Sequence, residues 1–166
     1  MPRHPHDNHA TGHLCTSACS GSGKPALLRY AEKTALAHSQ RWTAPRAEVY
    51  AALLDQRKPL TAYQLLEVVA TAGKRDVKPA TVYRALEALQ QLGLVAKIES
   101  RNAFIACRHP ETLHAHIFLV CDDCGDAAEV ADQDITAHLR RDAESHGFRA
   151  ARQIMELHGT CKSCQS

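Results

Sequence analysis

The sequence predicts an α+β fold in two parts. Residues 25–107 carry apolar residues at helical spacing and then two short β-rich runs, which predicts a winged helix-turn-helix unit. Residues 108–166 carry strand patterns and one helix pattern around two Cys-x-x-Cys pairs. The four cysteines are Cys121, Cys124, Cys161 and Cys164. Each pair lets two thiolates bind one metal ion from a tight turn, so both pairs complete a tetrahedral zinc site that staples a small α/β unit.

Redox dithiols are the alternative interpretation of the two cysteine pairs. Neither pair opens a helix after a strand, as a thioredoxin-like pair would, and one small unit has little use for two independent dithiols. The spacing therefore favours a structural metal.

Length and composition limit the class of protein. A chain of 166 residues has room for one ordinary domain or two small ones, and a hydrophobic fraction of 45% excludes wholesale disorder. The net charge of +2 is too small to indicate nucleic acid binding by itself. No apolar run is long enough for a membrane span and no secretory segment is present, so we expect a cytoplasmic protein. There the seven cysteines stay reduced, which favours metal binding over disulfides.

Four helices are expected in the first part. Apolar residues recur at helical spacing over residues 26–40, and Pro45 takes the first position of a second helix that ends near residue 56. Thr61 and Gln64 form a capping-box pattern, so Thr61 caps the third helix, and Gly73 follows its end.

The fourth helix runs from Pro79 to just before Gly93. Its apolar stripe comprises Val82, Ala85, Leu86 and Leu89. The β-rich runs 94–100 and 103–107 flank Arg101-Asn102 and predict a hairpin. In a winged helix-turn-helix, the last helix enters the major groove and the hairpin lies along the DNA backbone.

The second part is expected to alternate strands with one helix. The expected strands cover residues 116–120, 127–130 and 149–157. A helix over residues 134–146 has Asp132 or Asp134 as its cap and Gly147 as its stop. Ahead of both parts, residues 1–24 are rich in His and Cys, lack an apolar face and predict a flexible tail that either binds some metal or is a solvated arm without function.

Positive charges gather around the start of the fourth helix and the hairpin. They are Arg46, Lys74, Arg75, Lys78, Arg84, Lys97 and Arg101. Lys78 and the free amides after Pro79 present a positive helix end to phosphate, while Arg84 on the exposed face can reach guanine. The candidate DNA contacts are Tyr63, Arg84, Lys78, Thr81 and Arg46. The alternative is that these residues only keep the surface soluble.

Several stretches in this order resemble the ferric uptake regulator superfamily, and within it the zinc uptake regulators. They are Thr43-Ala44-Pro45-Arg46, Thr61-Ala62-Tyr63, Pro79-Ala80-Thr81-Val82-Tyr83-Arg84-Ala85-Leu86, Ile98-Glu99-Ser100 and the two cysteine pairs. The resemblance implies a homodimeric, metal-activated repressor of metal-uptake genes that binds double-stranded operator DNA. It assigns DNA binding to residues 25–107 and dimerisation to residues 108–166, and it implies that Tyr63 and Arg84 contact the operator.

The resemblance also implies a second, regulatory zinc at the junction of the two parts. Its ligands carry over to Cys107, His114 and Glu129, and His116 resembles a metal-binding histidine of iron and peroxide sensors. A thiolate, an imidazole and a carboxylate suit zinc, and the soft sulfur favours zinc over iron or manganese.

One position departs from the family pattern. The usual first-strand histidine corresponds to Ala96, which cannot bind metal. The fourth ligand is then His116, His109, a tail residue such as His13 or Cys15, or water.

The resemblance thus leads to the hypothesis that the second zinc docks the end of the wing onto the second part and so fixes the spacing of two recognition helices in a dimer. A first rival keeps DNA binding but senses iron, manganese or peroxide. A second is a constitutive DNA-binding protein with structural zinc only. A third, a zinc hydrolase using Cys107, His114 and Glu129, is the weakest because no motif supplies a general base, so we expect no enzyme.

Overall fold

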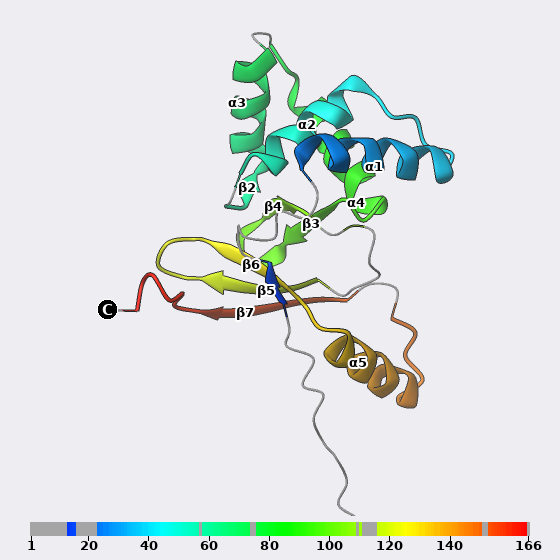
Figure 1. Cartoon of the computed structure of the whole chain (residues 1–166), viewed down its shortest axis with the longest axis vertical. Coiled ribbons are helices and arrows are strands. Elements are labelled where there is room, and N and C mark those ends of the chain that lie inside the picture. The colour runs from blue at the N-terminus through cyan, green and yellow to red at the C-terminus, as the bar shows by residue number, and fades with distance from the viewer. Residues whose placement is uncertain are drawn as a thin grey trace, which may run out of the picture.

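The computed structural model describes residues 13–15, 23–56, 58–73, 76–108, 110, 116–150 and 153–165. Within these residues, four helices gather over a small three-stranded sheet, and a four-stranded sheet with one further helix lies beneath them (Figure 1). We call the first group the winged unit and the second the lower unit. The arrangement confirms the predicted α+β fold class.

The four helices of the winged unit confirm the helical patterns of the sequence. They are α1 (Lys24–Ala37), α2 (Ala44–Leu54), α3 (Ala62–Gly73) and α4 (Pro79–Gln91). The capping box forms as predicted, because the Gln64 amide donates to Thr61 Oγ1 (3.3 Å) and the Thr61 amide donates to Gln64 Oε1 (2.9 Å). Gly73 is the last residue of α3 rather than the residue after it.

The small sheet has the strand order β2-β4-β3 and contains the predicted hairpin. Its strands are β2 (Leu60–Thr61), β3 (Val95–Ile98) and β4 (Ala103–Ala106). The connection between β3 and β4 is longer than the short turn we expected, because a 3₁₀ turn (Glu99–Arg101) precedes Asn102, whose φ of 47° asparagine tolerates. The sequence did not predict β2, since two residues carry no periodic signal.

One apolar cluster holds the winged unit together. It includes the predicted stripe of α4, all of which is buried, namely Val82, Ala85, Leu86 and Leu89. Tyr50 and Leu53 of α2 and Leu65 of α3 join this cluster from the facing helices. Burial of each such leucine contributes roughly 1.5–3 kcal/mol, so this unit has a core of its own.

The lower unit is a sheet of strand order β1-β6-β5-β7 with one crossover helix. Its elements are β1 (His13–Cys15), β5 (His116–Cys121), β6 (Ala127–Ala131), α5 (Gln133–Ser145) and β7 (Ile154–Gly159). The cap of α5 is Asp132, whose carboxylate accepts the amides of Asp134 (2.9 Å) and Ile135 (3.0 Å). β7 begins several residues later than its β-rich pattern suggested.

β1 lies within residues 1–24, which we predicted to be a flexible tail. Its backbone pairs antiparallel with β6, with Cys15 opposite Glu129. The sequence did not predict this strand, because a three-residue strand can form on a sheet edge without any apolar period of its own.

The wing hairpin lies on one face of the lower sheet. Ala96 and Ile98 of β3 form a small buried cluster with Phe118 and Val120 of β5, and Ile105 packs against it. The two units are thus joined by a thin apolar layer. No helix in the described part of the chain is both long enough and apolar enough to cross a membrane.

Candidate metal centre and DNA-binding surface

The four cysteines of the two pairs converge at one end of the lower sheet. β5 and β7 are parallel neighbours, with Cys121 opposite Gly159, so the turns that follow both strands leave the sheet at the same end. The four sulfur atoms all lie within 4.8 Å of one another, and Cys124 Sγ is 3.7 Å from Cys161 Sγ. A zinc tetrathiolate with bonds of about 2.3 Å has sulfur–sulfur edges of about 3.8 Å. The cluster therefore fits a tetrahedral zinc ion.

The thiols of this cluster differ in their readiness to ionise. Backbone amides of Cys124 and Cys161 donate to Cys121 Sγ and lower the pKa of that thiol to about 6. Hydrogen bonds with the side chains of Cys161 and Cys124 raise the pKa of Cys164 to about 12, and burial and the charge of Cys121 add to the shift. A divalent cation would displace the thiol protons and stabilise all four cysteines as thiolates.

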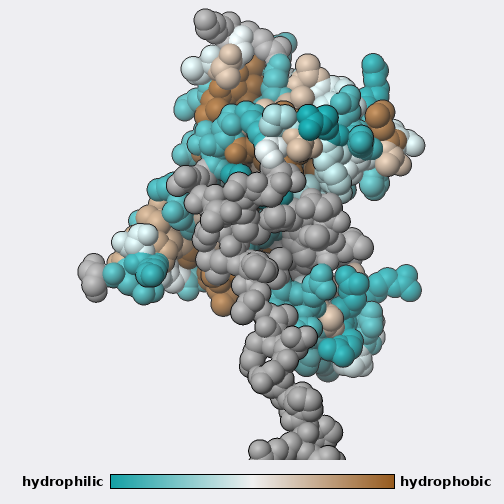
Figure 2. Space-filling model, viewed as in Figure 1, coloured by the Kyte–Doolittle hydropathy of each residue, from teal (hydrophilic) through white to brown (hydrophobic). Residues whose placement is uncertain are grey.

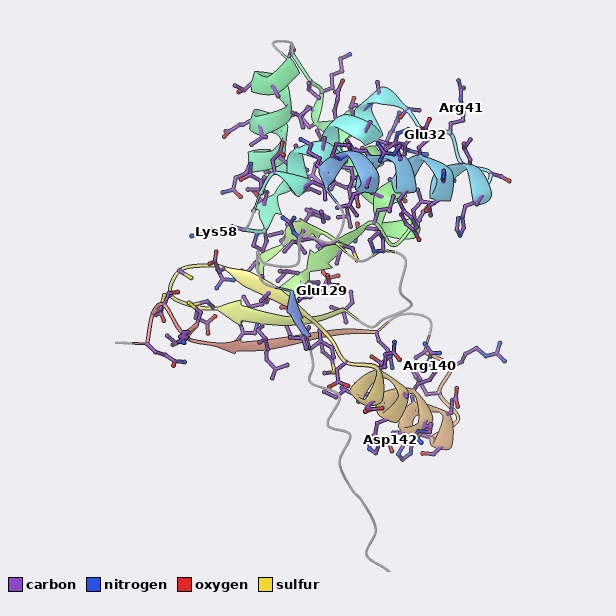
Figure 3. The ribbon with its side chains drawn as sticks, viewed as in Figure 1. Glu32, Arg41, Lys58, Glu129, Arg140 and Asp142 are labelled. Carbon is purple, nitrogen blue, oxygen red and sulfur yellow. The ribbon has the colours of Figure 1, made fainter. Side chains whose placement is uncertain are left out.

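Two of the predicted regulatory ligands are buried close to the junction of the units. Cys107, just after β4, is 1% exposed, and its carbonyl oxygen accepts the Tyr50 hydroxyl (3.3 Å). Glu129 lies on β6 (Figure 3). It is 7% exposed, which is unusual for a carboxylate. A cavity of about 940 Å³ is lined by Glu129 and by Ala106 and Arg108, the neighbours of Cys107 in the chain.

The other members of the predicted regulatory set are described less fully. His114 and His109 lie outside the described residues, and His116 contributes the backbone of β5, opposite Ile154 of β7. Ala96 is buried in the small cluster between the units. The four-ligand site at Cys107, His114, Glu129 and His116 stays a prediction.

Most of the predicted DNA contacts lie on the surface of the winged unit. Arg84 on α4 and Lys78 before it are exposed, and Tyr63 on α3 is 71% exposed. Thr81 is half-buried, and its amide donates to the Lys78 carbonyl (2.9 Å), which closes the first turn of α4. The side chains of Arg84, Lys78 and Tyr63 therefore lie outside the apolar core and are accessible to a partner.

Three residues differ from what the charge pattern suggested. Arg46 is half-buried and donates to the Arg41 carbonyl, so part of its guanidinium is already used. Lys97 pairs with Glu99 (2.6 Å). Arg101 turns toward the lower unit instead of a free surface, because it finds acceptors there. Lys74 and Arg75 lie outside the described residues.

One exposed aromatic residue was missed as a candidate. Tyr83 on α4 is 48% exposed, next to Arg84 and outside the apolar stripe. An aromatic ring placed off the buried stripe of a recognition helix was the available signal.

The fold agrees with that of known regulators. The model of the ferric uptake regulator family matches residues 37–158. The chain belongs to this family. The zinc uptake regulation protein of Escherichia coli K12 is 33% identical over 139 residues, which is 83% of this chain and 81% of the relative. That of Mycobacterium tuberculosis H37Rv is 30% identical over 126 residues, 76% of this chain and 95% of the relative.

Two solved structures of the family resemble the chain over both units. A zinc uptake regulator complexed with zinc and DNA is 32% identical, with a TM-score of 0.78 over 86% of this chain and 95% of that one. Holo XcZur is 39% identical, with a TM-score of 0.74 over 86% of this chain and 98% of that one. The chain is therefore a metal-responsive transcription regulator.

Proposed function

We propose that the chain is a zinc-responsive transcriptional repressor of metal-uptake genes, which binds operator DNA as a homodimer when a regulatory zinc is bound. The observation that carries this proposal is the TM-score of 0.78 to a zinc- and DNA-bound zinc uptake regulator over 86% of the chain. Agreement over that length involves the placement of both units as well as the fold of each. This supports a binding-competent arrangement of the winged and lower units.

In this proposal the four-cysteine centre holds a permanent, structural zinc. Cys121, Cys124, Cys161 and Cys164 all supply thiolates, and a closed four-sulfur shell leaves no position for substrate or water. The zinc supplies a cross-link between the ends of β5 and β7, and none of the chemistry of an open site.

The regulatory zinc would be held by Cys107, His114, Glu129 and His116. Its support is the burial of a thiol and a carboxylate from different units, together with a cavity that is lined by Glu129 and by both chain neighbours of Cys107. A thiolate in the set favours zinc over iron or manganese.

DNA binding is assigned to α3 and α4. The exposure of Arg84, Tyr63 and Lys78 supports direct contacts with bases and phosphates, with Thr81 at the start of the helix and Arg46 in a minor role. The domain division at about residues 25–107 and 108–166 follows the same proposal, since β4 ends just before Cys107.

The homodimer is assigned to the lower unit. α5 has no buried residues, and its apolar Ile135 and Leu139, on one side of the helix, are 41% and 38% exposed. Leu157 of β7 is also exposed, at 52%. The face of α5 seen in Figure 2 is mainly hydrophilic. An amphipathic helix with an uncovered apolar stripe is typical of a surface that packs against another chain.

Metal-dependent DNA binding tests the proposal. A duplex selected from random sequences by the zinc-loaded protein is titrated with protein in the presence of Zn²⁺, Fe²⁺, Mn²⁺ or a mild chelator. We expect zinc to raise the affinity about a hundredfold, equivalent to about 2.7 kcal/mol, and to act at the lowest free concentration. Activation by iron or manganese alone would contradict zinc sensing, and binding that ignores all metals would contradict sensing altogether.

A pair of variants tests whether Cys107 binds the regulatory zinc. Cys107→Ser removes one proposed ligand and should abolish the zinc dependence. Ala106→Ser introduces the same hydroxyl at the neighbouring buried position and should keep it. Unchanged zinc dependence in Cys107→Ser would show that the regulatory zinc lies elsewhere.

A further inference from the structure

Two basic side chains of the winged unit bind the first cysteine turn of the lower unit. Lys58 Nζ donates to the Cys124 carbonyl (2.8 Å), and Arg101 Nη2 donates to the Cys121 carbonyl (2.8 Å). Arg101 also pairs with Asp122 in the same turn (3.4 Å). Lys58 is labelled in Figure 3, beneath the helices of the winged unit.

A third contact joins the wing to β7, the strand that leads to the second cysteine turn. The Glu156 carboxylate accepts the backbone amides of Glu99 (2.6 Å) and Ser100 (3.3 Å) in the turn of the wing. Hydrogen bonds from the wing lower the pKa of Glu156 although burial opposes its ionisation. An ionised acceptor makes these bonds stronger than neutral ones.

The cysteine turn leaves room for this contact. Gly125 has a φ of +77°, and a Cβ atom there would lie 3.4 Å from the Arg101 guanidinium. Glycine therefore serves both the left-handed backbone and the close approach of the arginine. Next to these polar contacts lies the apolar layer of Ile98, Phe118 and Val120, so the interface has an apolar centre and a charged edge.

Charge complementarity favours this docking. A zinc ion bound by four thiolates carries a net charge of about −2, because the four negative charges of the thiolates exceed the two positive charges of the ion. Lys58 and Arg101 bring two positive charges to the backbone of one of its two turns. The contacts come from both sides of the helix-turn-helix in the chain, since Lys58 precedes β2 and α3 while Arg101 follows α4 and β3.

We propose that the winged unit docks on the four-cysteine centre, and that Lys58, Arg101 and Glu156 are positioning residues that fix α3 and α4 relative to this centre. The inference rests on the proposed structural zinc and on the proposed DNA binding. It gives the structural centre a role in operator recognition, separate from the regulatory zinc and from the stapling of β5 to β7.

Amide hydrogen exchange of the wing measures the docking without DNA. The zinc-loaded full chain is compared with the double variant Lys58→Ala/Arg101→Ala and with Glu156→Gln. We expect exchange at Glu99 and Ser100 to become about tenfold faster in each, as the loss of charge-assisted hydrogen bonds implies, with the zinc content unchanged. Lys162→Ala removes a positive charge from the second cysteine turn, within the lower unit itself, and should leave wing exchange unchanged.

A second readout separates positioning from a direct DNA contact. Two half-sites of the selected duplex are moved apart in single base-pair steps, and the affinity of each protein is measured at every spacing. Two winged units held in fixed positions bind best at one half-site spacing. The double variant should therefore bind several spacings with similar affinity, while Lys162→Ala should keep the wild-type preference for one spacing. Wing exchange like wild type, or a uniform loss of affinity with the spacing preference intact, would overturn the inference.

Failure of the proposed function gives a different result. In that case the wild-type chain itself would not retain zinc or would not bind DNA in a zinc-dependent way. A wild-type chain that does both, with variants that leave wing exchange unchanged, contradicts the docking role alone.

Discussion

The winged unit buries residues from all four of its helices in one cluster, whereas α5, all of whose residues are described, buries none. The lower unit instead buries mainly one face of its sheet, beneath the wing, and gathers four thiols at the end of that sheet. Units of this size rarely stabilise themselves by apolar burial alone. The comparison indicates that packing stabilises the winged unit, while metal and neighbouring surfaces stabilise the lower one.

The largest effect is expected from the loss of a structural ligand. Cys124→Ser leaves three thiolates and should forfeit much of a zinc contribution on the order of 10 kcal/mol, so the lower unit unfolds while α1 to α4 stay folded. Circular dichroism and amide exchange of each unit measure this. Persistence of a protected lower sheet in zinc-free Cys124→Ser would break the comparison.

A cavity in the winged unit should destabilise that unit and leave the lower unit and its zinc intact. Leu89 is completely buried in the cluster of the four helices. Leu89→Ala should lower the free energy of unfolding of this unit by about 2–5 kcal/mol, because the lost burial adds to an unfilled cavity. Urea denaturation gives the loss, and metal analysis should still find the structural zinc at full occupancy. Zinc loss in this variant would mean that the units do not stabilise themselves separately.

An exposed arginine of the winged unit should affect binding without affecting stability. Arg84→Ala should weaken binding to the selected duplex by about 1–3 kcal/mol and relax the base preference at one position. Arg140→Ala, an exposed arginine of α5, is the matched control and should leave the affinity within twofold, on the order of experimental error. Equal losses in both variants would point to net charge rather than base recognition.

The smallest effect concerns the pH dependence of the lower unit. Hydrogen bonds to Asp122 and then to Glu156 raise the pKa of His158 above its ordinary 6.5. Its stabilisation is therefore fully present below 6.5 and disappears as the pH rises through the higher value in the folded protein. The urea midpoint of the zinc-loaded chain should fall slightly over this interval, and His158→Gln should lose that part of the decline. His138→Gln, on exposed α5, should retain it.

Local patterns predicted most of the fold. The helices of the winged unit, the capping box at Thr61 and the cap of α5 depend on neighbouring residues, so the sequence contains them directly. The strand β1 and the 3₁₀ turn of the wing depend on partners elsewhere in the fold, and the sequence did not predict them.

The candidate sites divide in the same way. The four cysteines could be grouped because their spacing encodes the chemistry, and the structure brings them together. The contacts of Lys58, Arg101 and Glu156 join residues distant in the chain, and no spacing rule connects a lysine to a carbonyl oxygen across two units. The sequence alone grouped Arg101 with the positive charges near the fourth helix and the hairpin.

Graded withdrawal of zinc from the wild-type chain tests the account most directly. Amide exchange is followed in α2 and α4 and in β5 and β7 while a chelator of increasing strength removes the metal. The account predicts that β5 and β7 lose protection as the last zinc leaves, while α2 and α4 remain protected throughout. Simultaneous loss in both units, or a lower sheet that stays protected after all zinc has gone, would contradict it.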